Sequence, residues 1–216
     1  MKNKHVLIVT AHLDDFEIGM GGTAAALCKH NNVYLVVLCR GDRPGYEHVS
    51  LPRKETCIDN CNKIGMSDIT LYEYSDTTLD TIPQTEICNL IHDNIVKYNP
   101  SVVYTHNCSD VHKDHRIVSE CVRVSTRMRK QSSVNELYEF TIPGSTEWSH
   151  IPVNYNVYVN ISSTRNIKNT IIEKYNTEVR LSPDPVSIDM IEARDRYYGS
   201  ICGYSYAEAF RLIFKR

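Results

Sequence analysis

The sequence lacks the features that mark membrane-spanning, secreted and nucleic-acid-binding proteins. No apolar run approaches the roughly 18 residues needed to span a bilayer. The apolar stretch near the N-terminus holds only about six residues, too few for the core of a signal peptide. The 24 basic residues nearly balance the 26 acidic ones, for a formal net charge of −2. We therefore expect a cytoplasmic protein whose main partner is neither nucleic acid nor an anionic membrane.

The eight cysteines include no Cys-x-x-Cys pair. They are spread over predicted helices, strands and loops of a chain without an export signal, so we expect reduced thiols rather than disulfides. Cys57 and Cys61 lie on one helical face and are expected to be small buried side chains. The chain also lacks repeats, linkers and low-complexity tracts. Its 216 residues suit a single domain, 1–216, with a sizeable core.

Apolar β runs alternate with helical patterns along most of the chain. Strands are predicted at residues 5–10, 33–38, 69–72, 102–105, 137–140 and 156–159. Helices are predicted at residues 19–28, 53–64, 83–98, 117–128, 166–175 and 189–198. Residues 40–52 contain two glycines and two prolines and are predicted to form a loop. The alternation predicts an α/β fold, a Rossmann-like three-layer α/β/α sandwich with a mostly parallel sheet.

Two polar motifs follow predicted strands. Residues 11–17 read AHLDDFE, and residues 110–115 read DVHKDH. Because ligands of such sheets bind beyond the carboxyl ends of the strands, we expect the two motifs to converge. Imidazoles and carboxylates suit a divalent ion such as zinc, and three protein ligands leave an open position for water. The sequence therefore predicts a metal-dependent hydrolase.

The first motif offers two carboxylates with different roles. Adjacent residues do not normally point the same way, so Asp14 and Asp15 should not both bind the metal. If Asp15 binds with His12, Asp14 faces the water, whose pKa a divalent ion lowers from about 15.7 to roughly 7. The simpler interpretation is that one aspartate caps the following helix. The distant histidines favour the metal site.

The second motif places two imidazoles on one helical face. His112 and His115 are three residues apart, so both can serve one site. One can bind metal, while the other, when protonated, stabilises an oxyanion and donates a proton to a departing amine. Asp110 or Asp114 can hold either imidazole in its tautomer. The simpler interpretation is that these charged residues are solvent-exposed and merely begin a helix.

Two other functions stay open. Gly19-x-Gly21-x-x-Ala24 is typical of a dinucleotide-binding turn, which would make the chain a non-catalytic Rossmann-type nucleotide-binding module. However, residues 11–18 separate these glycines from the strand, and the carboxylates among them would repel a pyrophosphate. A metal-dependent phosphoesterase is the other alternative, although such sites usually use more carboxylates and two ions.

Together the motifs resemble the LmbE-like family of deacetylases, also called the PIG-L family. Its signature is AHPDDE followed by a glycine-rich GGT turn and a distant H-x-D-H. The corresponding segments here are residues 11–15, 19–23 and 112–115, and the tail segments 196–199 and 206–210 also match. Leu13 replaces the usual proline, and Phe16 stands where the family often has Glu, with Glu17 one position later. Members remove acetyl groups from N-acetylglucosamine-type sugars with a divalent metal, usually zinc.

The resemblance implies an LmbE-like deacetylase fold and a role for each motif residue. It assigns the metal, Zn²⁺ or another divalent ion such as Fe²⁺, to His12, Asp15 and His115. It makes Asp14 the general base, His112 the electrostatic or acid partner, Asp114 the residue that orients His112, and Arg53 a sugar contact. The expected reaction releases acetate and a free amine from an N-acetylated amino sugar or its conjugate. The identity of the sugar and the oligomeric state, a homo-oligomer included, stay open.

Two further residues lie near this edge of the predicted sheet. His106 ends the fourth strand close to the expected metal site, unlike His5, His30, His48, His92 and His150, which have no partner pattern and are expected to be structural or on the surface. Trp148 lies in the segment 143–150, a candidate cover for the site.

Overall fold

A computed structural model describes residues 2–42, 45, 50–127, 132–175 and 180–216, and within them seven strands form one sheet. The strands are β1 (His5–Thr10), β2 (Asn32–Cys39), β3 (Asp68–Tyr74), β4 (Val102–His106), β5 (Glu136–Phe140), β6 (Val157–Asn160) and β7 (Ala207–Lys215). Their order is β3-β2-β1-β4-β5-β7-β6. The strands β1 to β5 are parallel, whereas β7 runs antiparallel to β5 and β6.

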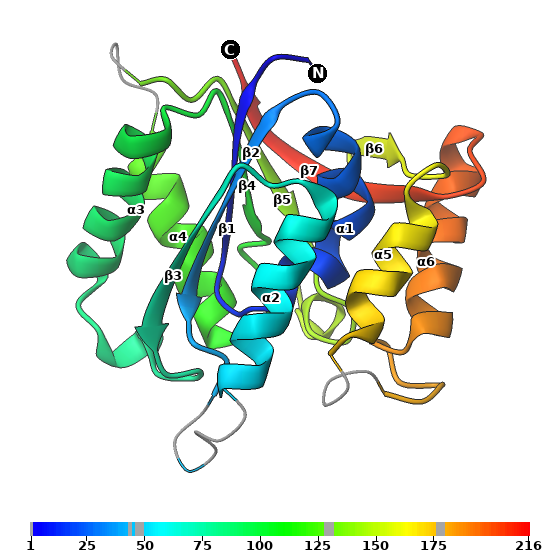
Figure 1. Cartoon of the computed structure of the whole chain (residues 1–216), viewed down its shortest axis with the longest axis horizontal. Coiled ribbons are helices and arrows are strands. Elements are labelled where there is room, and N and C mark those ends of the chain that lie inside the picture. Colours follow the sequence, from blue (N-terminus) through cyan, green and yellow to red (C-terminus); the bar gives the residue numbers. More distant parts are fainter. Residues whose placement is uncertain (1, 43–44, 46–49, 128–131, 176–179) are drawn as a thin grey trace.

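Helices cover both faces of this sheet (Figure 1). They are α1 (Asp15–Cys28), α2 (Ser50–Ile64), α3 (Gln84–Tyr98), α4 (Lys113–Ser125), α5 (Arg165–Glu173) and α6 (Ile188–Cys202). Helices α3 and α4 lie on one face, with α1, α2, α5 and α6 on the other. Strand β1 is buried on both sides, since Val6 and Ile8 join one core cluster and Leu7 and Val9 the other. The predicted three-layer, mostly parallel α/β fold is confirmed.

No helix in the described ranges is long and apolar enough to cross a membrane.

The elements differ from the predictions in several places. Helix α1 begins at Asp15 rather than at Gly19, because two helical pieces join across a kink at Met20 (φ −153°, ψ 22°). Helix α2 begins at Ser50, so the last residues of the expected loop 40–52 are helical, with Pro52 tolerated in the first turn. Strand β7 was not predicted. Residues 43–44 and 46–49 of the expected loop, and residue 128 of an expected helix, lie outside the described residues.

A buried ionic cluster explains why β7 is hard to find in the sequence. Glu208 lies within the strand yet is only 2% exposed. Its carboxylate is 2.8 Å from Lys168 Nζ and accepts hydrogen bonds from the backbone N–H groups of Gly22 and Thr23. Lys168 Nζ also lies 2.7 Å from Asp195 Oδ2. These contacts connect β7, α5 and α6 to helix α1, whose first residue, Asp15, belongs to the candidate site.

The glycines of α1 allow close packing. A Cβ atom on Gly19 would lie 2.4 Å from Phe140, and one on Gly22 would lie 2.9 Å from Ile161. These glycines lie inside a helix and face side chains of the core rather than a phosphate site. This arrangement disfavours the dinucleotide-binding interpretation.

Gly199 in α6 provides a test of the packing. A Cβ atom there would lie 2.6 Å from Tyr204 O and 2.9 Å from backbone atoms of Ser205 and Tyr206, which cannot move aside like a side chain. We expect Gly199→Ala to lower the free energy of unfolding by about 1–3 kcal/mol in urea denaturation. The exposed neighbour Ser200, changed to Ala, should shift it by less than about 0.5 kcal/mol. An undiminished stability of Gly199→Ala would contradict this packing.

Candidate metal centre

The two polar motifs meet at the carboxyl ends of β1 and β4, which are neighbours in the sheet. His12 follows β1, and Asp15 begins α1. His112 is the N-cap residue of α4, and His115 lies in the first turn of that helix. All four residues line one pocket of about 670 Å³. The predicted convergence of the two motifs therefore occurs.

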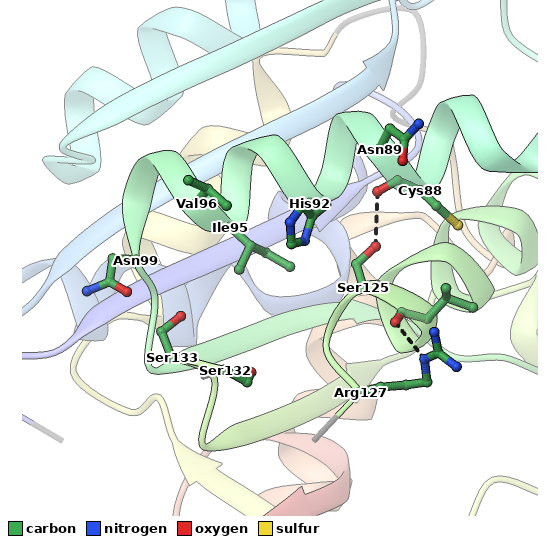
Figure 2. A pocket seen from close by; sticks show the side chains of 11 residues that line it. Cys88, Asn89, His92, Ile95, Val96, Asn99, Ser125, Arg127, Ser132 and Ser133 are labelled. Carbon is green, nitrogen blue, oxygen red and sulfur yellow. Dashed lines mark hydrogen bonds between the residues drawn. The ribbon is translucent and has the colours of Figure 1, made fainter. Parts of the chain in front are cut away.

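A larger hollow of about 860 Å³ lies elsewhere, between α3 and the end of α4 (Figure 2). None of the motif residues lines it. Its described lining residues are Cys88, Asn89, His92, Ile95, Val96, Asn99, Val124, Ser125, Arg127, Ser132 and Ser133. Size alone therefore does not identify the functional site of this protein.

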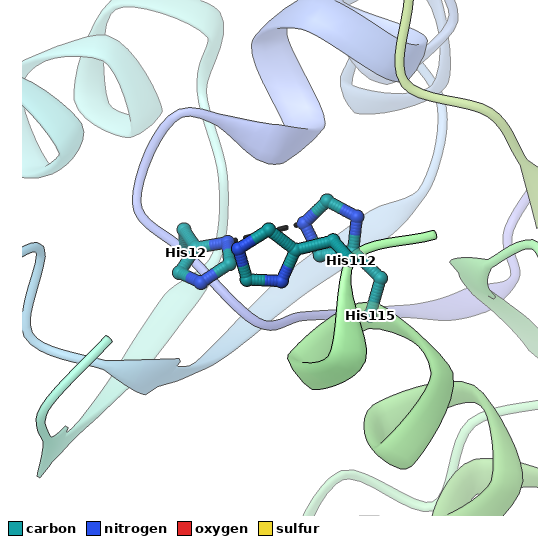
Figure 3. A group of neighbouring side chains, drawn as sticks. All are labelled: His12, His112 and His115. Carbon is teal, nitrogen blue, oxygen red and sulfur yellow. Dashed lines mark hydrogen bonds between the residues drawn. The ribbon is translucent and has the colours of Figure 1, made fainter. Parts of the chain in front are cut away.

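Three imidazoles form the centre of the smaller pocket (Figure 3). His12 Nδ1 lies 3.1 Å from His115 Nε2. The His112 ring centroid lies 4.7 Å from that of His12 and 4.5 Å from that of His115. One nitrogen atom from each of the three rings lies close enough to the other two for all three to contact a single metal ion. His12 and His115 are buried, whereas His112 is partly accessible from the pocket.

Asp15 brings a carboxylate to the same point. Its Oδ1 lies 3.3 Å from His115 Nε2, and its Oδ2 lies 3.5 Å from His12 Nδ1. Asp15 Oδ2 also accepts a hydrogen bond from the backbone N–H of His12 at 2.6 Å, which fixes the carboxylate. The structure thus brings together the three residues that the sequence proposes as metal ligands.

Each candidate imidazole ligand has a carboxylate on its far nitrogen. His12 Nε2 lies 3.2 Å from Asp114 Oδ2, and His115 Nδ1 lies 3.3 Å from Asp110 Oδ2. Such carboxylates fix the tautomer and the ring orientation of metal-bound histidines. The expectation that Asp114 orients His112 is therefore wrong. Asp114 projects from the first turn of α4 across to His12, and it also accepts the backbone N–H of Thr77 at 2.6 Å.

The electrostatics of this cluster favour a cation. Burial alone would lower the pKa of His12 and His115, but Asp15 together with Asp114 or Asp110 raises both pKa values. Burial would raise the pKa of Asp15, yet the surrounding imidazoles hold it well below its usual value. Three buried carboxylates, Asp15, Asp110 and Asp114, surround these two imidazoles, and their negative charge favours positive charge at this point. A divalent ion held by the inner nitrogens and Asp15 would supply that charge, so the residues present fit the metal.

His106 belongs to the cluster and has no signal in the sequence beyond its place at the end of β4. It is fully buried, and its Nε2 lies 3.0 Å from Asp15 Oδ2. Its ring stacks on that of His115 with centroids 4.0 Å apart. Burial and the charge of His115 lower the pKa of His106 to about 4, so the ring is neutral at pH 7. His106 therefore supports both a candidate carboxylate ligand and a candidate imidazole ligand.

Asp14 points away from the helix that it precedes. It is the N-cap residue of α1, but its side chain makes no capping hydrogen bond. Its Oδ1 instead lies 3.2 Å from Arg53 Nη2. The capping interpretation of Asp14 is therefore wrong, and its carboxylate lines the pocket beside the candidate ligands.

Arg53 is held at the pocket wall by several oxygens. Its Nη1 donates to Gly41 O at 2.7 Å and lies 3.6 Å from Asp76 Oδ2. Burial raises the pKa of Asp76 to about 6, and the charges of His12 and Arg53 oppose that rise. Sequence reasoning missed Asp76. The only signal for it is that it follows β3 at the same sheet edge as the two motifs.

The fold and this cluster define an α/β protein with a candidate metal centre at a sheet edge. Residues 7–125 match the family of GlcNAc-PI de-N-acetylases, PIG-L. The chain therefore belongs to the PIG-L family. The match includes both motifs of the candidate centre.

A curated relative from Bacillus anthracis supports this placement. It is named a probable N-acetyl-alpha-D-glucosaminyl L-malate deacetylase 2, and it is 31% identical over 135 residues. The similarity covers 56% of this chain and 59% of the relative. The chain thus matches only about three fifths of that relative's length.

Solved structures share the fold. N,N′-diacetylchitobiose deacetylase from Pyrococcus horikoshii superposes with a TM-score of 0.78 at 21% identity, covering 97% of this chain and 84% of that one. A 4-carboxy-2-hydroxymuconate hydratase from Pseudomonas putida KT2440 superposes with a TM-score of 0.75 at 17% identity, covering 100% of this chain and 98% of that one. Because this fold carries a hydratase as well as deacetylases, the function must be argued from the site.

Proposed function

We propose that this protein is a metal-dependent N-deacetylase that releases acetate and a free amine from an N-acetylated amino sugar or its conjugate. The observation that carries the proposal is the convergence of His12, Asp15 and His115, with a carboxylate behind each imidazole. Membership of the PIG-L family and the name of the Bacillus anthracis relative support the same reaction. The eight free thiols suit a reducing compartment, so we propose the cytoplasm as its location.

The metal in this proposal is Zn²⁺ or another divalent ion such as Fe²⁺, held by His12, Asp15 and His115. Two imidazoles and one carboxylate form a three-ligand set of the catalytic type, which leaves a position open. When bound, such an ion lowers the pKa of water and withdraws electrons from a carbonyl oxygen.

Asp14 acts as the general base in the proposed reaction. Its carboxylate accepts a proton from water as the oxygen attacks the acetamide carbonyl and the new C–O bond forms. The same carboxyl group passes this proton to the amide nitrogen as the C–N bond breaks. Arg53, 3.2 Å from Asp14 Oδ1, holds the carboxylate in position. The base therefore returns to its starting state, the amine leaves neutral, and the acetic acid formed releases its remaining proton to water to give acetate.

His112 stabilises the oxyanion that forms on the carbonyl oxygen. Burial and the charges of His12 and His115 lower the pKa of His112 to about 4. A neutral imidazole N–H is therefore present at pH 7. It can donate a hydrogen bond to the oxyanion, which is worth most in a site that excludes water. We assign His112 this role instead of the role of a protonated acid, and we assign delivery of the proton to Asp14.

Arg53 is proposed to bind the sugar next to the acetamide. We expect Arg53→Lys to raise KM by about tenfold, because Lys keeps the charge but loses the planar fork of donors that is fixed here by Gly41 and Asp76. Steady-state kinetics on an N-acetylated sugar measure this change. Arg123→Lys, in an ion pair with Glu139 outside the pocket, is the matched control. An unchanged KM for Arg53→Lys would remove Arg53 from the substrate site.

Acetate release from a panel of N-acetylated sugars, with and without a chelator, tests the proposed function. We expect release from at least one sugar, loss of release with the chelator, and recovery on adding Zn²⁺. Release of phosphate from phosphate esters, with no acetate from any sugar, would favour a phosphoesterase and contradict the proposal.

A further inference from the structure

The pocket extends from the metal centre to a rim with a different chemistry. Trp148, the single tryptophan of the chain, lines the same pocket as His12 and His112. It is 75% exposed, although a large aromatic side chain gains most from burial. An exposed indole at the mouth of a candidate active site is a surface to which a ligand can bind.

The turn that carries Trp148 is fixed to the metal centre. Trp148 ends a short 3₁₀ helix, residues Thr146–Trp148. Thr146 Oγ1 donates to Asp110 Oδ2 at 2.6 Å, and Ser145 Oγ donates to Asp110 Oδ1. Asp110 is the carboxylate that lies 3.3 Å from His115 Nδ1. The turn that carries the indole is therefore hydrogen-bonded to Asp110, the same carboxylate that contacts the candidate metal ligand His115.

A second segment meets this turn at the rim. A Cβ atom on Gly144 would lie 3.0 Å from Pro185, so the two segments are in close contact. Pro185 and Val186 line the pocket with Trp148. The rim therefore has an aromatic and aliphatic part, next to an ion pair between Arg180 and Asp184. The inner wall carries the other aspartates, the imidazoles and Arg53. Its volume of about 670 Å³ lies within the range of pockets that enclose ligands larger than one sugar ring.

We propose that Trp148 forms an outer subsite, which stacks against a ring in the unit attached to the N-acetylated sugar. This inference rests on the proposed function and deepens it. The polar inner wall takes the acetamide and its sugar, and the indole takes the flat apolar face of the next ring. Trp148 therefore sets a preference for a ring in the second unit of the substrate.

Trp148 reports its own binding event, because no other tryptophan contributes to the fluorescence of the chain. Zinc-loaded Asp14→Asn protein should still bind substrate but should hydrolyse very little of it during a titration. Titration of this variant with N,N′-diacetylchitobiose should change the emission in a saturable way. N-acetylglucosamine at the same concentrations should leave the emission nearly unchanged. An emission that does not respond to the disaccharide, or that responds equally to both sugars, would overturn the outer subsite.

Kinetics provide the second test. Trp148→Ala should lower the ratio of kcat/KM for N,N′-diacetylchitobiose to that for N-acetylglucosamine by about tenfold, the lower range for stacking on an aromatic side chain. Trp148→Phe should restore most of the ratio. Tyr197→Ala, an exposed aromatic on α6 outside this pocket, should not change it. Equal losses for both sugars in Trp148→Ala would overturn the subsite alone. Absence of acetate release by the wild-type protein from every sugar would instead overturn the proposed function.

Discussion

Replacing His115 by alanine is expected to remove the bound metal and to lower kcat/KM by more than about 100-fold, the upper loss for residues that merely support a metal ligand. His115 Nε2 faces both His12 Nδ1, at 3.1 Å, and Asp15 Oδ1, at 3.3 Å. Without this imidazole, two ligands remain, which is too few for a catalytic site of this kind. Elemental analysis of the purified variant measures the metal, and the acetate assay measures activity.

The control for this variant is His92→Ala. His92 is an exposed histidine on α3, and it does not line the pocket of the metal centre. We expect wild-type metal content and activity from it. Circular dichroism of both variants checks that the fold is retained. A folded His115→Ala protein that keeps about one metal ion per chain would contradict the ligand set.

Replacing Asp14 by asparagine is expected to reduce kcat by about 10²–10⁴-fold, the contribution typical of a positioned general base, while metal content stays near wild type. The amide keeps the shape of the side chain but cannot accept the proton. Asp14 is adjacent to Asp15, yet its own contact is with Arg53 rather than with the candidate ligands. Metal analysis together with single-turnover kinetics separates loss of the base from loss of the ion.

Asp59→Asn is the matched control for Asp14→Asn. Asp59 lies on α2 with its side chain 71% exposed, so the same chemical change there should leave kcat within about twofold of wild type. Full activity of Asp14→Asn would contradict the assignment of Asp14 as the general base. Loss of metal from the Asp14→Asn protein would instead indicate that Asp14 is a metal ligand.

The two ligand-bearing motifs could be predicted from the sequence to lie at the same sheet edge, because this placement depends on strand order alone. His12 follows β1 and His115 follows the end of β4, and adjacent parallel strands bring both to one edge. Which carboxylate faces which imidazole depends on side-chain directions across that edge. The motifs alone left open which imidazole Asp114 holds, and the family resemblance assigned it to His112, whereas the structure places it against His12. Asp76 was missed, and His106 was placed near the site without a role, because each is a single residue at a strand end.

The two departures from the family motif are accommodated in the structure. Leu13, in place of proline, is 1% exposed, and its carbonyl oxygen accepts a hydrogen bond from Tyr175 OH at 2.8 Å. This contact holds the loop in the absence of the proline. Glu17 is fully buried and accepts a hydrogen bond from Asn60 Nδ2 at 3.0 Å. Burial raises the pKa of Glu17 well above its usual value and so favours the uncharged carboxyl group in this packed environment.

We propose that one metal ion, held by His12, Asp15 and His115, makes this chain an amide hydrolase. The metal-free protein can be titrated with Zn²⁺ while acetate release from an N-acetylated sugar is measured. We expect no release before the first addition, a linear rise, and a break at about one equivalent per chain. Release by the metal-free protein, or a break at two equivalents, would contradict it.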